Sequence, residues 1–217
     1  MLKYAAVISM FILGIGFFTL NKLKENTVAS SSNTAKLLMK EFSTAKGQRA
    51  TITLVDGTKV YMGAASTLKY PEQFKDSIRN ISLQGEAFFE VAHNPQKPFI
   101  IQTHQIYTRV LGTSFKINAI EDRPFEVQVA TGKVRVDRIK PGNIEHLAVL
   151  TPGQQVSLNT LNGMAVTGQA EVKDIKEWKN SILVFKDQSL AQIATQLERA
   201  YDVKFSFRNA QTAKEVV

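Results

Sequence analysis

The chain has 217 residues, no cysteine and a formal net charge of +8. The length suits one large or two small domains, and the lack of cysteine excludes disulfide bonds, thiol catalysis and cysteine-ligated metal sites. The positive charge is spread along the chain without a basic run, so nucleic-acid binding is not expected.

An apolar segment opens the chain. Residues 5–20 read AAVISMFILGIGFFTL, with Lys3 before them and Lys22 and Lys24 after them. With the first four residues the run is about long enough to cross a bilayer, with the lysines at its two faces. A cleaved signal peptide is the alternative, but the residues that follow the run lack a small-residue cleavage site.

We therefore expect a transmembrane signal anchor over residues 1–24. The small polar residues that follow, NTVASSSNT, indicate a flexible linker over residues 25–35.

Residues 36–170 are dominated by short apolar runs between turn signals. Leu37 to Phe42 predicts a first strand or a short helix. Alternating apolar residues flank Asp56–Gly57, and Asp-Gly between such runs predicts a hairpin because glycine accepts positive φ. Further runs at 65–71, 78–84, 125–129, 134–139, 147–150 and 156–158 predict strands.

The densest part is Leu83 to Ala119, in which aromatic and β-branched residues form three or four extended runs. About ten short strands with regular turn signals are typical of a sandwich or barrel. The absence of alternating helices argues against a parallel α/β sheet.

The pattern changes at Glu171. Val172 to Asn180 predicts a short amphipathic helix with the only tryptophan, and Ser189 to Tyr201 predicts a longer helix, with Asp187 or Ser189 as its cap. Apolar strands are expected at Ile182–Phe185 and at Val203–Phe207. We predict a small β-α-β unit over residues 171–217, which resembles part of a domain because so few elements leave open sheet edges.

Several blocks in a fixed order point to one family. They read GQRATITLVDGTKVYMGAASTLKYP, ISLQGEAFFEVAHNPQKPFIIQT, VLGTSFKINA, VQVATGKVRV and LTPGQQ. Together they resemble FecR-type anti-sigma factors over roughly residues 40–208. The run EWKNSILVFKDQSLAQIATQLERAYDVKFSF is similar to the STN/secretin-like domain that follows in Bacteroidota members.

The resemblance implies a mainly β fold, with a jelly-roll-like β-sandwich at 36–170 after the transmembrane helix and the partial α+β domain at 171–217. It also implies a single-pass inner-membrane protein with most of the chain in the periplasm. Such a protein relays a signal by protein–protein contact. The signal passes from the N-terminal signalling domain of an outer-membrane TonB-dependent receptor to an extracytoplasmic-function (ECF) sigma factor.

Two departures from the family pattern stand out. The family holds its sigma factor by a cytoplasmic segment before the membrane helix, but only Met1 to Tyr4 precede it here. The C-terminal run resembles only the first half of the family's domain, and we expect either a mis-assigned start or a fragment to account for these departures. In addition, Gly63 occupies a position where the pattern favours a polar asparagine.

No arrangement of residues predicts catalysis, a cofactor or a metal. Glu86 and Glu90 share one face of a strand, and we interpret them as solvated charges rather than a glycosidase pair. His93, His104 and His146 lack metal-ligand spacing. The serines lie in no nucleophile motif.

The C-terminal unit is the best candidate for function, because an incomplete sheet offers unpaired backbone groups to a partner strand. We predict partner binding at Leu183, Val184, Phe185, Lys204, Phe205 and Phe207. The alternative function is a membrane-tethered β-sandwich that binds envelope glycans, which an exposed aromatic row on one sheet face would favour.

Overall fold

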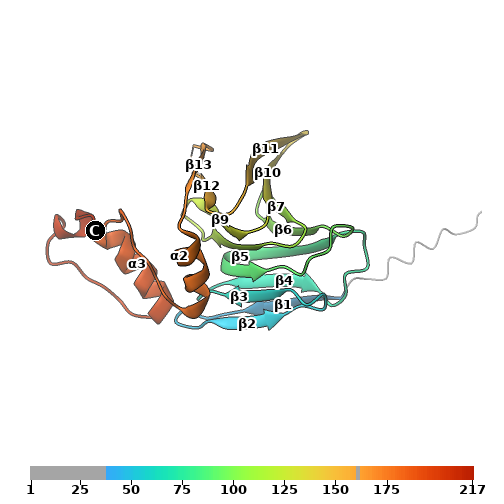
Figure 1. Ribbon diagram of the computed structural model, residues 1–217. Coiled ribbons are helices and arrows are strands. Elements are labelled where there is room, and N and C mark those ends of the chain that lie inside the picture. The colour runs from blue at the N-terminus through green and yellow to red at the C-terminus, as the bar shows by residue number, and fades with distance from the viewer. Residues whose placement is uncertain (1–37, 160–161) are drawn as a thin grey trace, which may run out of the picture. The chain divides into compact units, whose positions relative to one another are not determined.

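One long strand, β5 (Arg79–Glu90), runs through both halves of the β-sheet (Figure 1). A computed structural model describes residues 38–159 and 162–217, and within them thirteen strands form one continuous sheet. The first half of β5 belongs to sheet A and its second half belongs to sheet B.

Sheet A has the order β1-β4-β5-β6-β7-β10-β11. Beside β5 it consists of β1 (Met39–Ser43), β4 (Thr67–Pro71), β6 (Phe99–Thr103), β7 (Ile106–Val110), β10 (Val134–Lys140) and β11 (Asn143–Leu150). Sheet B has the order β2-β3-β5-β8-β9-β12-β13. It adds β2 (Ala50–Thr53), β3 (Lys59–Met62), β8 (Ser114–Ala119), β9 (Phe125–Thr131), β12 (Gln154–Leu158) and β13 (Ala165–Gln169).

The strand changes sheets at Gly85. Its φ is +97°, a backbone conformation that side chains disfavour, and a Cβ there would lie 2.5 Å from Ser66 Oγ. Ser66 Oγ accepts a hydrogen bond from the Glu86 N–H at 2.9 Å. Glycine at this position therefore lets the two sheets diverge from one strand.

The core lies between the sheets. Inward-facing residues of sheet A, such as Leu68 and Ile101, join those of sheet B, such as Phe89 and Phe115, in one buried cluster. The rings of Phe89 and Phe115 stack with their centres 5.3 Å apart. The alternation in the sequence predicts which residues point inward, and the mainly β prediction is confirmed.

The hairpin turn that the sequence predicts is present in the structure. Asp56–Gly57 forms the turn between β2 and β3, with Gly57 at φ +85°. For Leu37 to Phe42 a strand and a helix were both open; Met39 to Phe42 belong to strand β1, and Leu37 lies outside the described residues. The residues of strand β13 are mostly exposed, and apolar and polar residues alternate only weakly in them, so the sequence pattern does not predict this strand.

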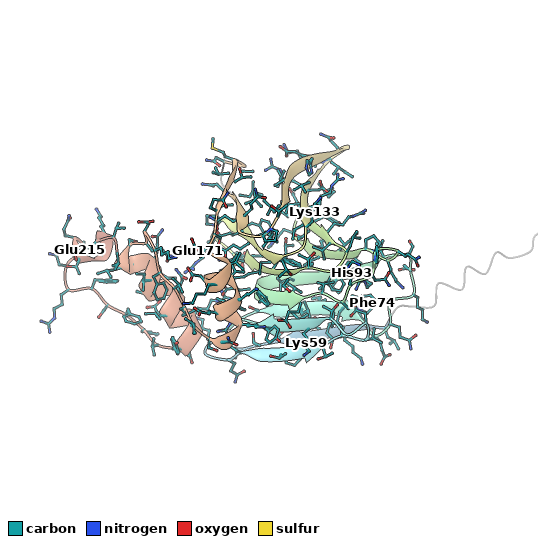
Figure 2. All side chains as sticks on the ribbon, viewed as in Figure 1. Lys59, Phe74, His93, Lys133, Glu171 and Glu215 are labelled. Carbon is teal, nitrogen blue, oxygen red and sulfur yellow. The ribbon has the colours of Figure 1, made fainter. Side chains whose placement is uncertain are left out.

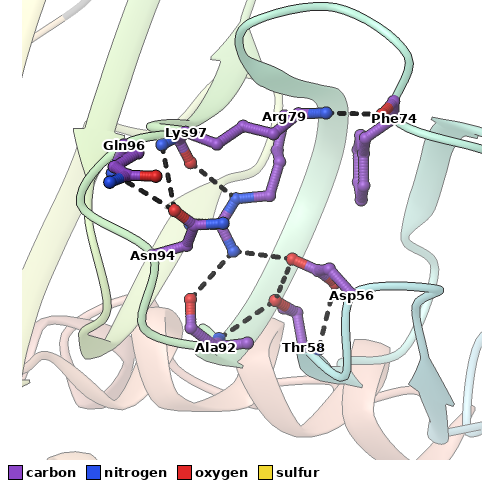
Figure 3. A network of polar contacts seen from close by, with 8 residues as sticks. All are labelled: Asp56, Thr58, Phe74, Arg79, Ala92, Asn94, Gln96 and Lys97. Atoms are coloured by element: carbon purple, nitrogen blue, oxygen red, sulfur yellow. Dashed lines mark hydrogen bonds and ion pairs between the residues drawn. The ribbon is translucent and has the colours of Figure 1, made fainter.

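A buried arginine network fastens one end of the core (Figure 3). The Arg79 side chain is 2% exposed, and its Nη1 donates to Asp56 Oδ2 at 2.7 Å and to the Ala92 carbonyl at 2.8 Å. Its Nε donates to the Lys97 carbonyl at 2.8 Å. One residue thus joins the start of β5 to the β2–β3 turn and to the loop that precedes β6.

Four helical elements follow β13: α2 (Val172–Glu177), the 3-10 turn η1 (Trp178–Asn180), α3 (Leu190–Tyr201) and the 3-10 turn η2 (Thr212–Lys214). Both predicted helices are confirmed. Ser189 caps α3, because its side chain accepts from the Gln192 N–H and the Gln192 side chain accepts from the Ser189 N–H. Asp187, the other predicted cap, lies outside the helix at φ +51°.

The two strands expected beside α3 do not form a sheet. Residues 182–185 and 203–207 carry no strand assignment, and within the described residues the segment makes one isolated bridge, between Ser189 and Val216. Both stretches are rich in apolar β-forming residues, but a strand also needs a neighbour to bond with its backbone. The predicted β-α-β unit is therefore a helix between two unpaired stretches.

The described residues belong to one compact unit that ends at Val217. No helix within 38–159 or 162–217 is long and apolar enough to cross a membrane. The predicted anchor at 1–24 and linker at 25–35 lie outside the described residues. The domain boundary between residues 170 and 171 stays a prediction.

Candidate partner-binding surface

The segment after β13 packs on the outer face of sheet B. Phe88, Ala130, Ile175 and Trp178 form a second buried cluster there, separate from the main core. Figure 2 labels Glu171, where this segment begins at the start of α2, and Glu215, which lies near the C-terminus of the chain. This cluster is the apolar anchor of the C-terminal segment.

Trp178 is the centre of this anchor and is 5% exposed. The guanidinium carbon of Arg49 lies 4.1 Å from its ring centre, and Lys116 Nζ lies 5.0 Å from it. A Cβ on Gly63 would lie 3.2 Å from Trp178 Cζ2. Glycine rather than asparagine at position 63 therefore leaves room for the ring.

Glu86 is the carboxylate around which the nearby cations gather. Its Oε1 lies 2.8 Å from Lys116 Nζ and its Oε2 lies 3.5 Å from Arg199 Nη1. Burial alone would raise the pKa of Glu86, but Lys116, Arg199 and Arg49 outweigh burial and hold this pKa below its ordinary value.

Glu90 is also paired. It binds Lys179 Nζ, and it accepts a hydrogen bond from the Tyr61 hydroxyl at 3.1 Å. The outer-face position of Glu86 and Glu90 agrees with the sequence pattern, but their interpretation as solvated charges is wrong. Their side chains are 17% and 30% exposed because the C-terminal segment covers this face.

Arg199 fastens α3 to the β-sheets. Its Nη2 donates to Ser66 Oγ at 2.9 Å, and its backbone carbonyl accepts from the Gly47 N–H at 3.0 Å. Burial lowers the pKa of Arg199, Glu86 opposes this change, and the nearby charge of Arg123 adds to it. The end of α3 is therefore held by polar contacts, whereas α2 and η1 are held by an apolar cluster.

The predicted partner-binding residues have different environments. Leu183 packs against the second cluster, so it anchors the segment. Val184 is 39% exposed, Phe205 is 48% exposed and Phe207 is 38% exposed. Phe185 is half-buried and Lys204 is exposed.

The backbone of this segment is largely unpaired. Within the described residues, no hydrogen bond reaches the backbone of residues 183–186. In 203–207, the Phe205 N–H donates to Glu198 Oε1 at 2.7 Å. The apolar stripe of α3 is also incompletely covered, because only Ala194 is fully buried and Tyr201 is 59% exposed.

Other candidate sites gain no support. In the described residues, no group of three or more histidine, cysteine or acidic side chains is placed to hold a metal. His146 Nδ1 contacts Asp137 Oδ1 at 2.9 Å, and this half-exposed histidine is paired with a buried carboxylate. Exposed aromatic side chains in the described ranges are Phe42 on β1 and Tyr201, Phe205 and Phe207 near the C-terminus, so they form no row on one sheet face.

Sequence reasoning missed the contacts that join the two parts. Arg49, Lys116 and Arg199 come from distant positions, and only the fold brings them to Glu86 and Trp178. The single tryptophan in a short amphipathic helix was the one available signal, since a lone large ring in such a helix usually packs on something.

Comparisons with known proteins agree with this arrangement. A family model described as "FecR protein" matches residues 40–135, and one described as "FecR, C-terminal" matches residues 182–217. No curated protein sequence matches. Two crystal structures of a candidate anti-sigma factor from Parabacteroides distasonis ATCC 8503, at 2.50 Å and 1.65 Å resolution, are similar to this chain.

Each of the two is 35% identical to this chain, with a TM-score of 0.69. The alignments cover 76% and 75% of this chain and the same shares of the two structures. The secretin-like fold of the C-terminal segment stays a prediction. The identity, the coverage and the two matching family models show that the chain belongs to the FecR family, a regulatory and non-enzymatic class of anti-sigma factors.

Proposed function

We propose that this protein is an inner-membrane-anchored periplasmic regulator that relays a signal from a TonB-dependent outer-membrane receptor to an ECF sigma factor. The N-terminal signalling domain of the receptor docks on the C-terminal segment. The relay works by linkage, because a partner that binds one conformation more tightly shifts the population toward it.

One observation supports the C-terminal segment as the place where the receptor domain binds. Residues 183–186 and 203–207 flank α3, carry no strand assignment and make few backbone hydrogen bonds in the described structure, and they expose Val184, Phe205 and Phe207. A partner strand gains affinity by pairing with such backbone groups and gains specificity by contacting alternate side chains. This combination supports a protein partner for the segment.

The docking site is tested with the full chain in detergent and the isolated signalling domain of the receptor. We expect capture of the domain by the wild type and at least about tenfold weaker binding by Phe205→Ser or Phe207→Ser, since burying a phenylalanine contributes about 1.5–3 kcal/mol. Val149→Ser is the matched control, because Val149 is 48% exposed on β11, outside the segment.

Two results would contradict the proposal. Undiminished binding by both phenylalanine variants would place docking elsewhere. Failure to capture any receptor domain, with retention of envelope polysaccharide instead, would favour the glycan-binding alternative.

A further inference from the structure

A cleft of about 1270 Å³ lies between the outer face of sheet B, α2 and α3. Lys116 of β8 and Gln128 of β9 line one side, and Gln196 and Arg199 of α3 line another. Leu183 and Val184, whose backbone groups make no hydrogen bond within the described residues, form part of the margin. The cleft is thus bounded by polar side chains and by a stretch of open backbone.

Four cations gather at one end of this cleft. Lys116 and Arg199 contact Glu86, Arg49 lies over Trp178, and Arg123 in the β8–β9 loop lines the same space. Glu86, Glu126 and Asp122, which precedes Arg123 in the same loop, are the carboxylates among them. The local balance is four positive charges against three negative ones, so this end has a small excess of positive charge.

Arg123 is the cation without a partner. Within the described residues, its guanidinium makes no hydrogen bond or ion pair, whereas the other three cations each make one or lie over the Trp178 ring. Burial lowers its pKa, with Glu86 opposing the change. A half-buried guanidinium without a partner is unfavourable until an anion reaches it.

Another part of the cleft lining is acidic. Asp174 pairs with Lys186 at 2.6 Å, and Glu171 and Asp187 line the cleft beside them. A nucleic acid or another extended polyanion would be repelled by these carboxylates. The Trp178 ring is covered by Arg49 and Lys116, so it offers no open face on which a base or a sugar could stack.

We infer that this cleft binds an extended peptide of a protein partner, with an acidic side chain of the peptide held by Arg123 and Arg199. Guanidinium groups suit carboxylates because they donate two parallel hydrogen bonds. The backbone of residues 183–186 supplies the donors and acceptors that a peptide strand requires. The identity of the partner rests on the proposed function, whereas the chemistry of the site rests on the cleft alone.

The probe is a blocked hexapeptide of alternating serine and valine in which one central serine is replaced by glutamate, compared with the peptide in which glutamine replaces that glutamate. Binding to the full chain in detergent is followed by the emission of Trp178, the only tryptophan in the sequence. We expect the glutamate peptide to bind with a dissociation constant below about 1 mM and at least about tenfold more tightly than the glutamine peptide, since a charged hydrogen bond contributes about 1.5–3 kcal/mol.

Arg123→Gln should abolish this preference without disturbing the fold, because Arg123 forms no ion pair in the described structure. Its unliganded Trp178 emission should match that of the wild type. Arg109→Gln is the control with the same charge change, because Arg109 is exposed on β7 of sheet A. That variant should keep the preference.

Equal affinity for the two peptides, no binding at 1 mM, or an unchanged preference in Arg123→Gln would overturn the inference. Glutarate that binds as tightly as the peptide would identify a free dicarboxylate as the ligand and also overturn it. Peptide preference without receptor capture would reject the proposed receptor alone. Receptor capture with no peptide preference would reject the cleft assignment alone.

Discussion

Arg49 and Trp178 are 129 positions apart in the sequence, yet Arg49 Nη2 donates to the Trp178 carbonyl at 2.7 Å and the guanidinium lies over the ring. The arginine immediately precedes β2 and the tryptophan follows α2 as the first residue of η1, so this contact joins sheet B to the C-terminal segment. Lys116 lies near the same ring at 5.0 Å. The C-terminal segment is therefore fastened to sheet B at one aromatic side chain.

Arg49→Ala should loosen this attachment. The change removes a charged hydrogen bond and a cation–π contact, together about 2 kcal/mol. We expect the Trp178 emission to move to longer wavelength and its quenching by acrylamide to increase. Lys46→Ala is the control, because Lys46 is exposed in the same loop. Identical emission from both variants would show that Arg49 does not hold the ring.

Gly63→Asn tests the space beside the same ring. A Cβ at this position would lie 3.1 Å from the Glu86 carbonyl oxygen and 3.2 Å from Trp178 Cζ2, closer than ordinary contact. We expect about 1–3 kcal/mol of destabilisation, measured by chemical unfolding, because overpacking forces neighbours to move. Gly142→Asn has nothing within 4 Å of the added Cβ and, at φ +74°, reports the backbone cost alone. A smaller loss at position 63 than at position 142 would contradict the steric argument.

The β-strands could be predicted from the sequence because alternation and turn residues are local signals. The Asp56–Gly57 hairpin and the inward set that includes Phe89 and Phe115 follow from period 2 and from the conformational freedom of glycine. The switch of β5 between sheets at Gly85 is different. It depends on the close approach of Ser66, which no local pattern indicates.

The surroundings of Glu86 could not be predicted for the same reason. Period 2 places Glu86 on the outer face correctly, but a strand pattern does not reveal what covers that face. The cover comes from Trp178 and Arg199, which follow more than ninety positions later in the printed sequence. At Phe205 and Phe207 the composition predicts a strand, whereas pairing depends on a neighbour that the described residues do not provide.

Asp56→Ala should destabilise the fold strongly. Arg79 is buried, and Asp56 is its only carboxylate partner in the described residues, at 2.7 Å. Removing one partner of a buried ion pair costs about 3–5 kcal/mol, because the remaining charge stays buried without compensation. The free energy of unfolding in urea measures the loss. The double variant Asp56→Ala with Arg79→Met should recover part of it, and no recovery would mean that Arg79 is not the cause.

Glu126 should have the opposite effect from Glu86 on the pH dependence of stability. Burial and the nearby Glu86 carboxylate raise the pKa of Glu126, and Lys116 only partly offsets them. A raised pKa means that the ionised side chain destabilises the fold, so this cost is absent below the ordinary pKa of 4.5 and appears as the pH rises through the folded-state value.

Glu126→Gln should therefore melt at a higher temperature than the wild type at pH 7 and at nearly the same temperature at pH 3.5. Glu86→Gln is the opposed control. Burial alone would raise the pKa of Glu86, but Lys116 and Arg199 together lower it by more, so the folded-state pKa lies below the ordinary value. The ionised Glu86 side chain therefore stabilises the fold above pH 4.5, and this stabilisation is lost as the pH falls through the folded-state value. That variant should melt at a lower temperature at pH 7. A Glu126→Gln variant with no gain at pH 7, or with the same gain at both pH values, would show that the Glu126 carboxylate is not strained by its neighbours.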